Sequence, residues 1–205
     1  MVSMALSGDI AAIVGAYHGD PFRVLGPHLV SHGDHQRLEI RAFLPEAGEA
    51  AVVADDGVHP MRRLHPDGFF EAVLDRDHVV PYRLRIGKGS GRRELEDPYR
   101  FPGWLTDFEI HLHGEGTWLQ SYEKLGAHRR EVAGVRGVNF AVWAPNAERI
   151  GVVGDFNGWD GRRHPMRQRG GGLWELFIPD LGEGAVYKYE VKSRQRGYLQ
   201  QKADP

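Results

Sequence analysis

The residues best suited to chemistry lie together on one turn, Gly154-Asp155-Phe156-Asn157-Gly158-Trp159, between two runs that are typical of strands. Gly, Asn and Asp favour turns, and side chains on turns generally point into water. An exposed indole beside a carboxylate and an amide suits a flat, amphipathic ligand such as a sugar ring. We therefore predict that Trp159 contacts a saccharide, that Asp155 and Asn157 hydrogen-bond its hydroxyl groups, and that Phe156 anchors the turn.

Two further side chains are candidates for the same ligand. Lys188 lies between Tyr187 and Tyr189 in a predicted strand, so the two-residue period of a strand puts it on the face opposite to both tyrosines. It either donates to the saccharide or is an ordinary solvated lysine. Tyr198 is either a second aromatic platform or a loop tyrosine. One or two such platforms predict weak binding, on the order of millimolar to tens of micromolar.

No metal site, cofactor site or catalytic set is predicted. His111 and His113 are two residues apart on a possible strand and would then share a face, and a second histidine group comprises His28, His32 and His35. The chain has no Cys, and neither group has a third ligand at a suitable spacing, so solvated histidines are favoured. The sequence also lacks a Gly-x-Ser-x-Gly motif and any evident Ser, His and Asp set.

Composition narrows the class of protein. The 205 residues carry a formal charge of −2, which argues against nucleic acid or a membrane as the main partner. The absence of Cys fits a reducing compartment, and the N-terminus lacks the basic and apolar regions of a signal peptide. We therefore expect a cytoplasmic protein.

The chain repeats itself with an offset near 100 residues. Residues 40–47 resemble residues 140–147. Five further matches follow in the same order: 52–53 with 152–153, 59–61 with 164–166, 70–74 with 174–178, 82–86 with 187–191, and 97–98 with 204–205. Six matches in order indicate two related modules. Trp143 and Trp174 align with Phe43 and Phe70, so we expect both tryptophans in a core.

Short alternating runs separated by Gly and Pro predict an all-β fold of two immunoglobulin-like β-sandwich modules. The first is expected at residues 1–105, with a short helix near residues 9–16 that Asp9 caps. A linker over residues 106–133, with a strand-like run at 108–112 and a short helix near 121–125, precedes the second module at residues 134–205. The first module has only Ala54-Asp55-Asp56-Gly57 in place of the aromatic turn, which favours a ligand role for Trp159 over a core role.

These residues carry a resemblance. Residues 140–147, the aromatic turn, residues 174–179 and residues 187–189 resemble the starch- and glycogen-binding module of the family 48 type. With residues 18–22, 25–28 and 114–128, the whole chain resembles the N-terminal region of bacterial 1,4-alpha-glucan (glycogen) branching enzymes. The resemblance puts Trp159 and Lys188 at glucan-contacting positions. The module's second stacking Trp falls near Tyr198 or Leu199, and its absence here implies weaker binding.

The resemblance also implies what this chain does not do. Branching enzymes of glycogen biosynthesis cut an α-1,4-glucan chain and transfer it to a 6-hydroxyl group, which forms an α-1,6 branch. That work belongs to a (β/α)8 barrel, none of whose catalytic residues has a counterpart in these 205 residues. The barrel of the same polypeptide is expected after Pro205, so the chain is expected to be a fragment that is inactive alone. Its expected ligands are glycogen and malto-oligosaccharides.

Two alternatives remain open. In the first, the modules are structural, pack on the catalytic barrel and set the length of the transferred chain. In the second, the chain is a self-standing module that targets glycogen.

Overall fold

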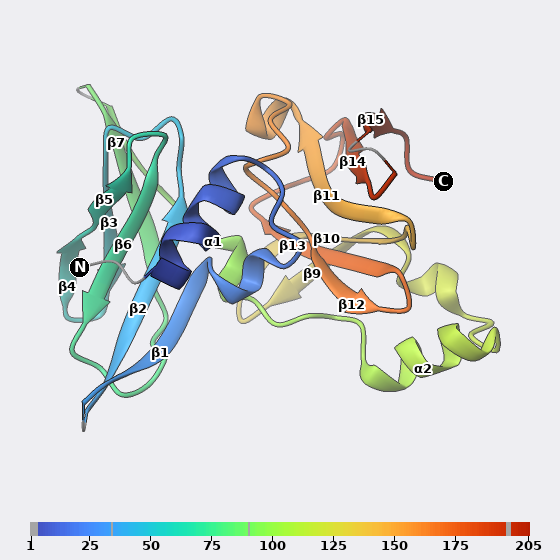
Figure 1. Cartoon of the computed structure of the whole chain (residues 1–205), viewed down its shortest axis with the longest axis horizontal. Helices are drawn as coiled ribbons and strands as arrows, with labels where there is room; N and C mark the ends of the chain where they lie inside the picture. The colour runs from blue at the N-terminus through green and yellow to red at the C-terminus, as the bar shows by residue number, and fades with distance from the viewer. Residues whose placement is uncertain (1–3, 34, 90, 196–197) are drawn as a thin grey trace. The chain divides into compact units, whose positions relative to one another are not determined.

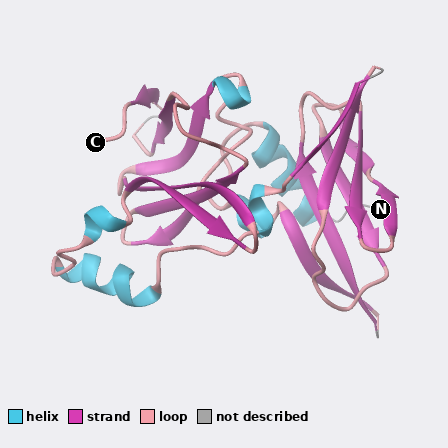
Figure 2. Cartoon of the chain, turned by 180° about the vertical axis from the view of Figure 1, so that it is seen from behind, coloured by secondary structure: helices cyan, strands magenta, loops and turns pink. Residues whose placement is uncertain are grey.

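The computed structural model describes all residues except 1–3, 34, 90 and 196–197. The chain divides into two compact units, Met1–Val14 with Phe22–Arg100, and Gly15–Pro21 with Phe101–Pro205. The described residues of both units form mainly antiparallel strands, as Figures 1 and 2 show, so the all-β prediction is confirmed. Neither α-helix in the described part of the chain is long and apolar enough to cross a membrane.

The first unit is a sandwich of two described sheets, ordered β1-β2-β6-β5 and β4-β3-β7-β8. Buried apolar residues from both sheets, such as Ile40 and Leu84, form its core. The elements from the N-terminus through this unit are α1 Met4–Val14, the 3-10 helix η1 Pro21–Arg23, β1 Gly26–His32, β2 His35–Phe43, β3 Glu49–Ala54, β4 Gly57–Pro60, β5 Arg62–His65, β6 Phe69–Leu74, β7 Arg83–Lys88, β8 Gly91–Leu95 and η2 Pro98–Arg100.

The second unit has sheets ordered β12-β13-β10-β9 and β11-β14-β15. The rings of Phe140 and Tyr187, one from each sheet, meet edge to face with centroids 4.8 Å apart. Its elements are α2 Asp107–Glu115, η3 Ser121–Glu123, β9 Gly126–Val132, β10 Val135–Trp143, β11 Ala147–Gly154, η4 Asp155–Asn157, β12 Arg167–Gly170, β13 Leu173–Pro179, β14 Tyr187–Ser193 and β15 Leu199–Lys202.

The internal repeat extends to individual hydrogen bonds. The Leu44 amide donates to the Gly68 carbonyl at 2.7 Å, and the Ala144 amide donates to the Gly172 carbonyl at 2.7 Å. The hydroxyl of Tyr82 donates to Asp97 at 2.6 Å. The matching pair of the second unit, Tyr187 and Asp204, makes the same bond. Both modules therefore tie their C-terminal Asp-Pro to a tyrosine at the start of a strand, Tyr82 directly before β7 and Tyr187 as the first residue of β14.

The repeat begins earlier than the sequence indicated. The ring Nε2 of His28 lies 3.1 Å from the Leu25 carbonyl oxygen, and that of His128 lies 2.9 Å from the Leu125 carbonyl oxygen. Strand β9 pairs with β10 as β1 pairs with β2. Residues 126–132 of the predicted linker are therefore a strand of the second sandwich. These residues alternate between half-buried and exposed positions, but few of them are apolar. The sequence therefore showed little of the apolar alternation that predicts a strand.

Two helices differ from expectation. The first helix is Met4–Val14, so Asp9 lies inside it and does not cap its start. Residues 108–112, expected as a strand, are part of α2. Apolar residues alternate there, but Thr106 and Glu109 form a capping box at the start and Gly116 ends the helix with φ 73°. The 3-10 helix η3 lies within the residues 121–125 where a short helix was predicted.

Trp143 and Trp174, both predicted to lie in a core, differ in how much of the side chain is exposed. Trp174 is 1% exposed, as predicted, but Trp143 is 54% exposed, so the core prediction for Trp143 is wrong. Trp143 is the last residue of β10, and its indole N–H donates to the Gly171 carbonyl at 3.0 Å. Its ring also meets that of His113 at a centroid distance of 5.6 Å. Position at a strand end allows a side chain to leave the core although its counterpart Phe43 stays buried.

Candidate functional site

Asn157, which is 1% exposed, supports the aromatic turn of residues 154–159 by hydrogen bonds from its side chain. The backbone amide of Gly154 donates a hydrogen bond to Oδ1 of Asn157 at 3.0 Å. Its Nδ2 donates to the Val152 carbonyl at 2.8 Å and to Nδ1 of His164 at 2.8 Å. These bonds engage both ends of the amide, so Asn157 shapes the turn and is not accessible to a ligand.

The backbone of Trp159 has φ 59°, a left-handed conformation that is uncommon for a large side chain. Its amide donates to the Gly154 carbonyl at 2.9 Å, which closes the turn. Its indole N–H donates to Oδ1 of Asp155 at 2.8 Å. Asp155 is exposed, and it fixes the plane of an indole that is itself only partly buried. The turn therefore presents a pre-oriented aromatic surface.

Trp159 lines a hollow of about 480 Å³ on the outer side of the β11-β14-β15 sheet. Glu190 and Lys192 of β14 and Leu199 of β15 line the same hollow. Lys188 is exposed and alternates along β14 with buried Tyr189, so it lies on the same face as Glu190 and Lys192. The structure thus brings Trp159, Lys188 and Leu199 to one face of the sheet.

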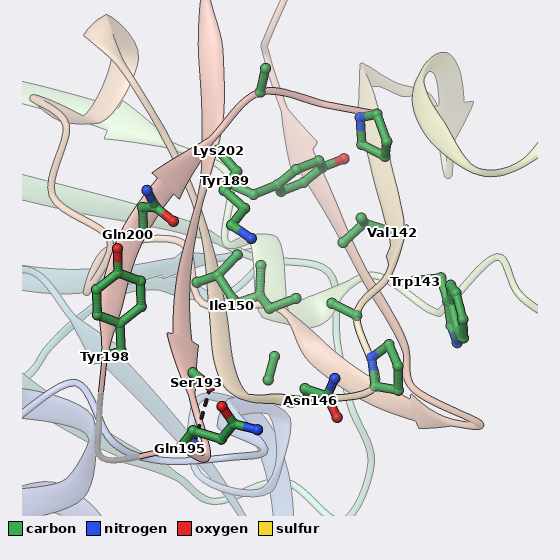
Figure 3. Close-up of a pocket in the computed structure, with 16 residues that line it drawn as sticks. Val142, Trp143, Asn146, Ile150, Tyr189, Ser193, Gln195, Tyr198, Gln200 and Lys202 are labelled. Carbon is green, nitrogen blue, oxygen red and sulfur yellow. Dashed lines mark hydrogen bonds between the residues drawn. The ribbon is translucent and has the colours of Figure 1, made fainter.

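Tyr198 belongs to a different hollow, of about 440 Å³. Figure 3 shows it beside Gln200, with Trp143 at the other side of that hollow. Tyr198 directly precedes Leu199, and successive residues of an extended chain point to opposite faces. The structure therefore separates Tyr198 from Trp159 and leaves Leu199, which is 54% exposed, beside the Trp159 hollow.

The floor of the Trp159 hollow includes a buried arginine that the sequence did not single out. Arg149 is 2% exposed, donates to the Gly161 carbonyl at 2.6 Å and forms an ion pair with Glu190 at 2.5 Å. Through these two contacts, Arg149 of β11 connects the segment after the turn to β14. The sequence analysis also did not name Lys192 as a candidate ligand contact. The two-residue period of a strand puts Lys192 on the same face of β14 as Lys188, so the same argument applied to it.

His164 packs under the turn, with its ring centroid 5.6 Å from that of Phe156. Burial lowers the pKa of His164 to about 3, and its neutral Nδ1 accepts from Asn157. Phe156 is partly buried against this ring, in keeping with an anchoring role.

The lowered pKa of His164 predicts a pH dependence. Below its ordinary value of 6.5 the unfolded chain gains a proton there, whereas the folded chain does not until about pH 3. This group therefore makes the second unit less stable as the pH falls from 6.5 towards 3, by at most about 1.4 kcal/mol per pH unit, and has no effect above that range. NMR titration of the ring checks the cause, and a transition near pH 6.5 in the folded chain would contradict it.

The histidines considered for metal lie on different elements of the chain. His111 and His113 lie on α2, where residues two apart do not share a face. His28 bonds to a backbone carbonyl, and the side chain of His32 lies outside the described residues. Within the described part of the chain, no three His, Cys, Asp or Glu residues are grouped to hold a metal ion.

Two family models match the two modules. The alpha-1,4-glucan branching enzyme GlgB N-terminal domain matches residues 6–99, and carbohydrate-binding module 48 (isoamylase N-terminal domain) matches residues 124–205. The chain belongs to the GlgB family, as its N-terminal region. The second match begins just before β9, in agreement with the early start of the second sandwich.

Curated GlgB relatives match almost the whole chain. The chain is 55% identical over 97% of its length to the 1,4-alpha-glucan branching enzyme GlgB of Paramagnetospirillum magneticum, and covers 26% of that protein. It is 50% identical over 96% of its length to GlgB of Cereibacter sphaeroides, and covers 27% of that protein. This GlgB region thus spans about a quarter of the relatives it matches. Among solved structures, a pullulanase from Anoxybacillus sp. LM18-11 is 16% identical with a TM-score of 0.33, covering 87% of this chain and 25% of that chain.

Proposed function

We propose that this GlgB region is the non-catalytic, glucan-holding part of a cytoplasmic glycogen branching enzyme. Its second module binds linear α-1,4-glucan in the Trp159 hollow, and a catalytic barrel elsewhere in the same polypeptide forms the α-1,6 branches. The observation that supports this most is the pre-oriented indole of Trp159, which shares a hollow with Leu199 in a module that matches a carbohydrate-binding family.

Each side chain has a defined part in this proposal. The Trp159 indole covers the apolar face of a glucose ring, while Asp155 keeps the indole plane in place. Lys188 donates to hydroxyl groups of the glucan from the same sheet face. Asn157 acts indirectly, through the shape of the turn.

The expected affinity is low. Covering part of one indole face removes roughly 100 Å² of apolar surface from water, worth about 2 kcal/mol before ordering costs. Leu199 offers less flat surface than the second stacking Trp that the resemblance implies near Tyr198 or Leu199. We therefore expect a dissociation constant on the order of millimolar to tens of micromolar for maltoheptaose.

Trp159→Ala is expected to weaken maltoheptaose binding by at least about tenfold, since about 2 kcal/mol of stacking is lost. Isothermal titration calorimetry or NMR shifts measure this directly. Fluorescence is less selective, because the chain has five Trp residues.

Trp143→Ala is the matched control, because Trp143 is also exposed but lines the other hollow. It should bind maltoheptaose as the unsubstituted chain does. Loss of binding in this variant alone would move the site to the Tyr198 hollow. No binding by the unsubstituted chain would instead favour purely structural modules.

A further inference from the structure

The short segment Gly15–Pro21, which follows α1, belongs to the second unit. Gly15 and Ala16 line the Trp159 hollow together with residues of the aromatic turn, β14 and β15. An added Cβ at Gly19 would lie 3.7 Å from the carbonyl oxygen of Glu148, so the segment runs close against β11. The wall of the hollow therefore includes residues about 140 positions away from Trp159 in the sequence.

Tyr17 is the aromatic residue that this segment brings to the site. The Lys192 ammonium lies over its ring, 5.6 Å from the centroid, and Lys192 itself lines the hollow. Lys192 pairs with Leu199 across β14 and β15, so Tyr17 and Leu199 flank the same lysine. Tyr17 is 48% exposed, which leaves much of its ring accessible next to the hollow.

The backbone on both sides of the hollow is strained. Among the described residues, the non-glycine residues with positive φ are Ala16, Ala133, Trp159 and Asp180. Ala16 at 58° and Trp159 at 59° both line this hollow. Such conformations cost on the order of 1–3 kcal/mol and concentrate at ligand sites. One of these residues is the aromatic Trp159 itself, and the other directly precedes the aromatic Tyr17.

We propose that Tyr17 is the second aromatic platform of the glucan site. Tyr17 supplies the second stacking ring, which Leu199 cannot supply because its side chain is aliphatic. Trp159 stacks on one stretch of an α-1,4-glucan chain and Tyr17 on another, while Lys192 holds the Tyr17 ring and donates to nearby hydroxyl groups. This inference rests on the proposed glucan binding, and it adds a residue from outside the carbohydrate-binding module match at residues 124–205.

Four variants of the 205-residue chain test the proposal by calorimetric titration with maltoheptaose. Tyr17→Ala should weaken binding about fivefold or more, and Tyr17→Phe should bind within twofold of the unsubstituted chain. Tyr17→Trp should bind more tightly, which a merely structural role would not produce. Tyr122→Ala is the control, since Tyr122 is 69% exposed on η3 and does not line the hollow.

The outcomes separate this inference from the proposed function. If Trp159→Ala loses binding but Tyr17→Ala stays within twofold, the role of Tyr17 is overturned and the Trp159 site stands. If Tyr17→Ala weakens binding but Tyr122→Ala weakens it as much, the role of Tyr17 is also overturned. No binding by the unsubstituted chain overturns both proposals.

Discussion

Asn157→Ala is expected to abolish measurable glucan binding and to lower the free energy of unfolding of the second unit by about 3 kcal/mol. The substitution removes the acceptor of the Gly154 amide and the donor to the Val152 carbonyl, and it leaves His164 without its partner. The Gly154 amide and the Val152 carbonyl are buried and His164 is partly buried, and each buried group left unsatisfied costs about 1–3 kcal/mol. The turn then no longer holds Trp159 in its left-handed conformation.

Urea unfolding and maltoheptaose titration measure the two effects of Asn157→Ala separately. Asp155→Ala is the matched control on the same turn, because Asp155 is exposed and its carboxylate accepts from the Trp159 indole N–H at 2.8 Å. It should weaken binding severalfold and leave stability nearly unchanged. If Asn157→Ala unfolded at the same urea concentration as the unsubstituted chain, the role of Asn157 as the support of the turn would be refuted.

Glu175→Ala is expected to destabilise the second unit by about 3–5 kcal/mol, the usual cost of breaking a buried charge pair. Glu175 is 1% exposed. Its Oε2 accepts from the amides of Trp104 and Leu105 at 2.8 and 3.0 Å, and its Oε1 accepts from Arg169 at 2.7 Å. Its loss leaves the buried Leu105 amide and the partly buried Trp104 amide without this acceptor and removes the closest carboxylate of Arg169.

Thermal unfolding measures the effect of Glu175→Ala, with Glu131→Ala as its control. Glu131 pairs with Arg136 at 3.3 Å, but both side chains are mostly exposed, so this pair contributes less than about 1 kcal/mol. A destabilisation by Glu175→Ala as small as that of Glu131→Ala would show that the carboxylate does not hold residues 104–105 to β13.

Much of the fold and the candidate binding residue Trp159 followed from local patterns. Two modules were evident because strand alternation, Gly and Pro breaks and the paired Asp-Pro ends recur in order. The turn that carries Trp159 was evident because Gly, Asn and Asp select turns through their own backbone preferences. The opposite directions of Lys188 and Tyr189 follow from the period of a strand.

Other features required the tertiary structure. Alternation at residues 108–112 was compatible with a strand, and the capping box with Thr106 made it a helix. Polar β9 joins its sheet through pairing with β10 rather than through an apolar pattern of its own. The sequence offered Asn157 as a ligand contact, whereas packing against Val152 and His164 buries it.

The sequence by itself determined that this chain has two related β modules, with an aromatic turn in the second that suits a sugar. Only the tertiary structure decided which neighbours share the site with Trp159. The two-residue period of a strand predicts that the side chains of Tyr198 and Leu199 point to opposite faces. The pairing of β15 with β14 decides that Leu199, and not Tyr198, lines the same hollow as Trp159. The same holds for Tyr17, because a contact between residues so far apart in the chain depends on how the whole unit packs, and no local pattern encodes it.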